Sequence, residues 1–202
     1  MSNLLPPSFY ERDDVVRIAR ELLGMRCVSR VGGVPTAGEI VETEAYRGHD
    51  DRACHACDRR TGQTRPTPRT ATMFGPAGRA YVYLCYGIHH LLNVVTNRAG
   101  RADAVLIRGL YPAEGLDVMR ERRNHQPNLT TGPGNVTQAL GITTAHNGLD
   151  LRGDTLWIED RGLRPPPETI RAAPRVGVDY AGEDALRPWR FRIDPAAMTD
   201  FS

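Results

Sequence analysis

The alternation of apolar and polar positions divides the chain into short strands and a few helices. Apolar side chains at helical spacing follow the acidic pair 13–14, which predicts a helix over residues 15–23 that ends at Gly24. β-Branched side chains dominate residues 27–31 and 38–47, so these segments predict two strands. A Gly-Gly turn between them favours direct pairing of the two strands.

Residues 48–72 show neither helical spacing nor strand-like alternation of apolar residues, and they are mostly polar. Their basic residues are Arg52, Arg59, Arg60, Arg65 and Arg69. A structureless loop of this length inside a compact domain is usually functional or mobile. We therefore expect a functional or mobile loop here.

Regular patterns resume after this loop. The expected elements are a β-hairpin over 80–96 that turns at 86–88, a strand over 104–110, helices over 116–123 and 136–140, a strand over 156–159, and closing segments 175–178 and 188–192. Strands and helices do not alternate regularly, which indicates an α+β fold. We predict a single domain over residues 1–202, with a curved, largely antiparallel sheet, a protruding β-hairpin and flanking helices.

Candidate chemistry first appears on the strand over 38–47. Because side chains alternate along a strand, Ile40, Glu42, Glu44 and Tyr46 are expected to share one face. Carboxylates two residues apart lie roughly 6.5–7 Å from each other, near the spacing of the acid/base pair in inverting sugar hydrolases. Exposed carboxylates on an ordinary strand would show the same pattern.

Arg108 ends the apolar run 104–107, which places its guanidinium in or beside the core. A charge there is costly unless it is paired, and Glu44 or Glu42 is the expected partner. The pair could be a buried structural ion pair, or a carboxylate and an arginine that hold one water between them. The residues alone leave both interpretations open.

Tyrosines give the hairpin a second candidate surface. Tyr81 and Tyr83 project to the same side of one strand, where aromatic residues serve packing more often than ligand binding. Tyr86 stands at the turn, where packing explains a large ring less well. Such a ring could be a wedge inserted between base pairs from the minor groove.

Composition sets limits on the protein's class. The chain has 202 residues with 40% hydrophobic and 25% charged residues, as expected for a soluble globular domain. It shows no run long enough to span a bilayer and no secretory leader, so we expect an intracellular, cytoplasmic protein. All 26 basic residues are arginine, and without lysine no side-chain amine can form a Schiff base.

Four cysteines, Cys27, Cys54, Cys57 and Cys85, are expected to be free thiols. Cys54 and Cys57, with His49 nearby, resemble half of a zinc site. A structural zinc usually needs a second ligand pair at matching spacing, which Cys27 and Cys85 do not offer. We therefore expect no metal and no cofactor.

Together these residues resemble the alkyladenine (3-methyladenine) DNA glycosylase family, over about residues 9–191. The matching motifs, in chain order, are 40–46 with His55, 65–69 leading to 73–74, 81–87 with Asn93, 104–108, 132–134 before 138–140, and 175–178.

The resemblance implies roles for the matched residues. Glu44 would be the general base that activates a water, which Arg108 and the Val178 backbone would help to hold. The implied purine pocket has Tyr46 and His55 on one wall, Tyr83 on the opposite wall, and Asn93 against the exocyclic amine of guanine. Tyr86 would fill the gap left by the flipped nucleotide. The implied contacts to the DNA backbone are Arg65, Thr67, Gly134 and Asn135.

The implied partner is double-stranded DNA with damaged purines, bound by a monomer. The enzyme would release the base and leave the strand unbroken. The alternatives are a non-catalytic nucleic-acid-binding module on the same scaffold and a zinc-dependent hydrolase. The chain departs from the mammalian pattern by a longer segment between His55 and Arg65, which adds Arg59 and Arg60, and by Thr70, Tyr111 and Asn135. These departures bear on substrate range and DNA affinity.

Overall fold

The computed structural model describes residues 3–194 and 196–197 of the chain. Its strands are β1 (Arg26–Ser29), β2 (Thr36–Tyr46), β3 (Ala80–Cys85), β4 (His89–Thr96), β5 (Asp103–Glu114), β6 (Leu156–Glu159), β7 (Ile170–Ala173) and β8 (Arg190–Ile193). The α-helices are α1 (Pro7–Tyr10), α2 (Val15–Glu21), α3 (Leu116–Arg122) and α4 (Pro133–Leu140). Short 3₁₀ helices cover Val31–Gly33, Ala71–Phe74, Thr144–His146, Pro167–Thr169 and Asp179–Leu186.

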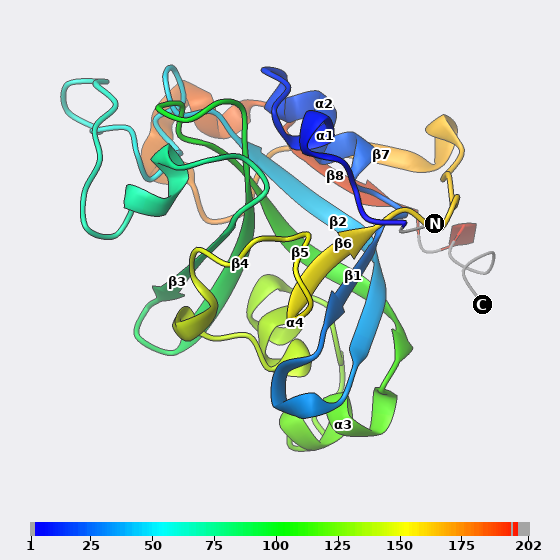
Figure 1. The fold of residues 1–202 in the computed structure, drawn as a ribbon. Coiled ribbons are helices and arrows are strands. Elements are labelled where there is room, and N and C mark those ends of the chain that lie inside the picture. Colours follow the sequence, from blue (N-terminus) through cyan, green and yellow to red (C-terminus); the bar gives the residue numbers. More distant parts are fainter. Residues whose placement is uncertain (1–2, 195, 198–202) are drawn as a thin grey trace.

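The strands form one eight-stranded sheet in which every pair is antiparallel (Figure 1). Six strands follow one another in the order β3-β4-β5-β2-β1-β6, and β8 pairs with β2 and with β7. The predicted α+β fold is therefore confirmed. Strand β2 lies at the centre: its first half pairs with β1, its second half pairs with β8, and β5 follows it along the other edge. Two segments far apart in the chain thus meet around one strand.

Helix α2 packs across β2 and shows why the predicted helix forms. The Asp14 carboxylate accepts the main-chain N–H of Arg17 at 2.9 Å, which caps the first turn. Ile18 is fully buried, and the Thr43 hydroxyl donates to the carbonyl of Ala19 at 2.8 Å. The helix ends at Glu21, two residues before the predicted end.

The β3–β4 hairpin projects from the body of the molecule, as predicted (Figure 1). Tyr86 and Gly87 both adopt positive φ at its turn, at 51° and 74°. Helix α4 packs beside the hairpin, where the Thr137 hydroxyl donates to the carbonyl of His90 at 2.6 Å. The hairpin tip is therefore held against the start of α4.

The segment after β2 is more ordered than the structureless loop predicted from its polarity. Cys54, Ala56 and Cys57 are buried in a small second core with Met73 and Tyr81. Turns fix the backbone between these residues. The segment is thus a packed part of the fold and not a structureless loop.

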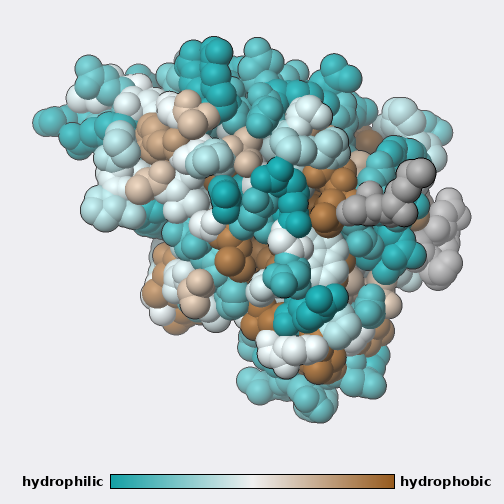
Figure 2. Space-filling view, viewed as in Figure 1, coloured by the Kyte–Doolittle hydropathy of each residue, from teal (hydrophilic) through white to brown (hydrophobic). Residues whose placement is uncertain are grey.

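The surface in Figure 2 is largely hydrophilic, and apolar residues appear there only as small separate areas. Within residues 3–194 and 196–197, every helix is too short or too polar to cross a lipid bilayer.

Candidate active site

A cavity of 560 Å³ opens between β2, the β3–β4 hairpin, the start of α4 and the segment around Val176. Its lining includes Glu44, Tyr46, His55, Tyr83, Tyr86, Asn93, Arg108, Gly134, Asn135 and Val178 from the sequence-based set. Residues that are distant in the chain are thus brought to one place. Arg65 and Thr67 are not in the lining: Arg65 pairs with Asp58 at 3.2 Å, and the Thr67 hydroxyl lies 2.9 Å from that of Thr70.

Two register shifts in the pairing of β2 with β5 direct Arg108 toward the cavity. Between Ile40 and Glu42, β2 carries an extra residue relative to β5, and between Glu42 and Thr43 the extra residue is Arg108 on β5. Such bulges re-aim side chains next to functional sites. They also break the predicted alternation at Ile40, which packs in the main core instead of sharing a face with the carboxylates. Glu42, Glu44 and Tyr46 do share a face, where both carboxylates contact Arg108 and Tyr46 contacts Glu44.

Glu44 is fully buried at the cavity, and each of its oxygens has a donor. The main-chain N–H of Val176 donates to Oε1 at 2.8 Å, and the Tyr46 hydroxyl donates to Oε2 at 2.8 Å. The guanidinium of Arg108 lies 3.4 Å from Oε2. Burial raises the pKa of Glu44, and the charge of Arg108 opposes this rise. The carboxyl group is therefore a stronger proton acceptor than an exposed one.

Glu42 ties Arg108 to a second arginine outside the cavity. Arg108 Nε donates to Glu42 Oε1 at 3.2 Å, and Arg190 Nη1 lies 3.3 Å from the same oxygen. Glu42 is not part of the cavity lining. Of the two candidate carboxylates, only Glu44 faces the cavity, so the pair is not arranged like an acid/base pair on either side of a sugar.

Aromatic rings form the side of the cavity along β3. Tyr81 and Tyr83 stack with centroids 5.3 Å apart, as their shared face predicted. His55 meets Tyr83 edge-on at 4.6 Å, and its Nδ1 lies 3.4 Å from the Tyr81 hydroxyl. Burial, with the charges of Arg69 and Arg59, lowers the pKa of His55 to about 4, so its ring is neutral at pH 7.

The remaining predicted residues surround this aromatic side. Asn93 is buried and donates through Nδ2 to the carbonyl of Tyr81 at 3.1 Å. Tyr86 is 89% exposed at the hairpin tip. The Asn135 amide donates to the carbonyl of Thr131 at 2.7 Å, and thereby braces the turn that starts α4.

Arg175 was missed as an individual residue by the sequence analysis. Its side chain is fully buried, pairs with both oxygens of Asp51 and donates to the carbonyl of Ala45 at 2.9 Å. Its guanidinium lies 4.8 Å from the centroid of the Tyr46 ring. Arg175 thus holds Tyr46 and the backbone before Val176, both of which contact Glu44. Only its place beside residues 176–178 could have signalled this.

The cysteines are free thiols, as predicted. Cys54 points its sulfur at the carbonyl of Ala102 at 3.6 Å, and Cys57 points its sulfur at that of Gly62 at 3.6 Å. Burial raises the pKa of Cys54 to about 12. Among the described residues, no three His, Cys, Asp or Glu side chains are grouped to hold a metal ion.

Comparison with known proteins places this chain in a family. The family model for methylpurine-DNA glycosylase matches residues 8–197. A protein of Anaeromyxobacter dehalogenans (strain 2CP-1) is 50% identical over 190 residues, which cover 94% of this chain and 81% of that protein. Proteins of Chlamydia felis and Bacillus cereus (strain G9842) are each 44% identical, over 95% and 92% of this chain and 96% and 93% of their own lengths. All three carry the name "Putative 3-methyladenine DNA glycosylase".

The protein is a DNA glycosylase, a hydrolase that acts on N-glycosyl bonds in DNA. The chain belongs to the methylpurine-DNA glycosylase family, which the resemblance of its motifs had indicated. Its substrate is accordingly DNA, and its pathway is base excision repair.

Proposed function

We propose that this enzyme flips alkylated and deaminated purines out of duplex DNA and hydrolyses their N-glycosidic bond with a water activated by Glu44. The substrates would include 3-methyladenine, hypoxanthine and 1,N6-ethenoadenine. The observation that carries the proposal is the fully buried carboxylate of Glu44 at an aromatic-lined cavity, 3.4 Å from a guanidinium. We further propose that it acts as a monomer inside the cell.

Glu44 would serve two purposes in the reaction. It takes a proton from the water, which the Arg108 guanidinium and the Val178 backbone help to hold. A cationic alkylpurine then leaves as a neutral base and the proton passes to solvent, whereas a neutral purine takes up one proton as it leaves. Its negative charge also stabilises the positive charge that develops on the sugar as the bond breaks. The Val176 N–H and the Tyr46 hydroxyl fix the carboxylate, so it need not reorganise during the reaction.

The cavity suits a flipped purine nucleotide. Its volume of 560 Å³ lies within the range of small-molecule sites. Tyr46 would form one wall and Tyr83 the other. His55, expected beside Tyr46, instead contacts Tyr83 edge-on with ring centroids 4.6 Å apart, so the base would stack between Tyr46 and the His55–Tyr83 pair. A positively charged alkylpurine leaves readily and is attracted by ring faces. Asn93 would crowd the exocyclic amine of normal guanine.

Contacts outside the cavity would hold the bent duplex. Tyr86 would enter the gap left by the flipped nucleotide, because its exposed ring has no packing role in the free protein. Gly134 and Asn135 lie at the start of α4, where free N–H groups suit a phosphate. Arg65 and Thr67 would reach the DNA backbone outside the cavity.

The enzyme would leave an abasic site without cutting the strand. Strand cleavage by a glycosylase proceeds through a Schiff base, which needs an amine nucleophile. All 26 basic residues are arginine, so only the N-terminal amine could take that part.

Single-turnover base release from lesion-containing duplexes tests the proposal. We expect Glu44→Gln to lower the rate at least 10³-fold while DNA binding persists, because the amide cannot accept the proton. Glu42→Gln is the matched control, since Glu42 pairs with Arg108 but does not face the cavity. Release by Glu44→Gln at the wild-type rate would remove Glu44 from the mechanism, and equal loss in both variants would make the two carboxylates a functional pair.

A further inference from the structure

The segment between Cys57 and Thr64, which makes this chain longer than the mammalian pattern, is a compact projection that we name the 57–64 turn. Cys57 and Thr64 form an antiparallel bridge at its base. Inside it, Asp58 Oδ1 accepts the main-chain N–H groups of Arg60 and Thr61, each at 3.0 Å. These bonds fix the directions in which the two arginines of the turn leave the backbone.

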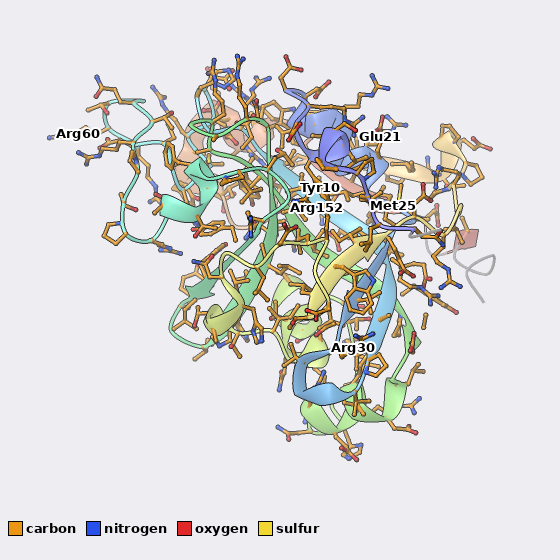
Figure 3. All side chains as sticks on the ribbon, in the orientation of Figure 1. Tyr10, Glu21, Met25, Arg30, Arg60 and Arg152 are labelled. Atoms are coloured by element: carbon orange, nitrogen blue, oxygen red, sulfur yellow. The ribbon has the colours of Figure 1, made fainter. Side chains whose placement is uncertain are left out.

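The two arginines point in different directions. Arg59 lines the cavity, and its guanidinium carbon lies 3.6 Å from the centroid of the Tyr180 ring. Tyr180 is itself held by a hydrogen bond from its hydroxyl to the carbonyl of Ala53 at 3.2 Å. Arg60 points away from the body of the molecule (Figure 3) and is not part of the cavity lining.

Arg59 changes what the cavity offers a bound base. The guanidinium of Arg59 covers one face of the Tyr180 ring, so this face is closed to a cationic base. A second guanidinium, that of Arg69, lies 4.8 Å from the centroid of Tyr83. The two guanidiniums repel a base that carries its own positive charge and so oppose its attraction to the rings, whereas a neutral base is not repelled.

We propose that Arg59 is a specificity-determining residue that shifts the enzyme's preference from cationic N-alkylpurines toward neutral damaged purines. This inference rests on the proposed function, since it concerns the base that enters the same cavity. A contact between Arg59 and a DNA phosphate would make a different prediction: such a contact weakens binding of every duplex equally and lowers its salt dependence.

The test compares Arg59→Gln with the matched control Arg60→Gln. Each is assayed on one duplex sequence that carries 7-methylguanine, which is cationic, or hypoxanthine or 1,N6-ethenoadenine, which are neutral. The measured quantity is the ratio of kcat/KM for the cationic lesion to kcat/KM for the neutral lesions. We expect this ratio to rise about tenfold in Arg59→Gln, because the substitution removes one partly screened positive charge near the base. Arg60→Gln keeps the wild-type ratio.

Two results would overturn the inference: an unchanged ratio, or equal losses on all lesions with a weaker salt dependence. The proposed function fails separately, if the wild-type enzyme releases none of these bases. In that event the dissociation constants of the three duplexes, measured for Glu44→Gln with and without Arg59→Gln, still give the ratio on which Arg59 is judged.

Discussion

Glu44 is the residue at which stability and chemistry conflict. A fully buried carboxylate prefers its protonated form, and burial raises its pKa although Arg108, the Val176 N–H and the Tyr46 hydroxyl favour the ion. These three neighbours therefore offset only part of the free-energy cost of burying the ionised carboxylate. Because its pKa stays raised, the ionised carboxylate is a stronger base than that of an exposed glutamate.

The acidic limb of the pH–rate profile should report this balance. The proposed general base must be ionised to accept a proton, so we expect the release of the purine to fall as the pH drops through the raised pKa of Glu44. Arg108→Gln removes the charge that lowers this pKa, and we expect the limb to move to higher pH, with a loss of about 10²-fold in rate at neutral pH. Single-turnover rates across pH measure both effects.

Arg190→Gln is the matched control for Arg108. Arg190 contacts Glu42 but is not among the groups that shift the pKa of Glu44. Its loss should leave the acidic limb in place. A limb that stays fixed in Arg108→Gln would mean that another group titrates there.

At the scale of elements, the β3–β4 hairpin carries the exposed end of the site. Tyr86 adopts a positive φ, which is uncommon for a tyrosine, and its ring is almost fully exposed. His89, the first residue of β4, lies so close to the start of α4 that a Cβ at Gly134 would lie 2.9 Å from its Nδ1. A side chain at position 134 would therefore displace His89 from the start of α4.

Truncation of the tip ring should affect DNA binding and not folding. We expect Tyr86→Ala to weaken binding of a lesion duplex about tenfold, through loss of stacking on the neighbouring bases. Its thermal unfolding midpoint should match the wild type, because the ring is exposed. Tyr86→Phe keeps the ring and should bind normally; if the phenylalanine variant binds as weakly as the alanine variant, stacking is not the cause.

Sequence reasoning predicted the hairpin and the sites of its tyrosines because their pattern is local. It could not predict the register shifts around Glu42, which depend on how β2 pairs with β5. The position of Arg175 was missed for a related reason, since its partners lie on other segments. Polarity suggested a structureless loop over 48–72, where cysteines and alanines in fact form a small core.

At the scale of the whole molecule, Arg175 and Asp51 join the C-terminal segment to the end of β2. Both side chains are fully buried, and Arg175 also donates to the carbonyl of Asp184 at 2.9 Å. Tyr46 packs against both of the smaller apolar clusters at this junction. The residues that hold Glu44 in place therefore also connect the C-terminal segment to the rest of the fold.

Loss of one partner of this ion pair should destabilise the protein strongly. We expect Arg175→Met to lower the free energy of unfolding by about 3–5 kcal/mol, because it leaves the carboxylate of Asp51 buried without its partner. Urea unfolding measures the change. The double variant Arg175→Met, Asp51→Leu should recover part of it; a double variant as unstable as the sum of the single ones would show that the two residues act independently.

The donor that holds Glu44 comes from Val176, 132 residues further along the chain, and β8 follows only after it. A ribosome must therefore deliver most of the polypeptide before the Glu44 carboxylate acquires this hydrogen bond and its neighbouring strand. Nascent chains that stop short of this point lack both the Val176 donor and β8, so the surroundings of Glu44 are completed only near the end of synthesis.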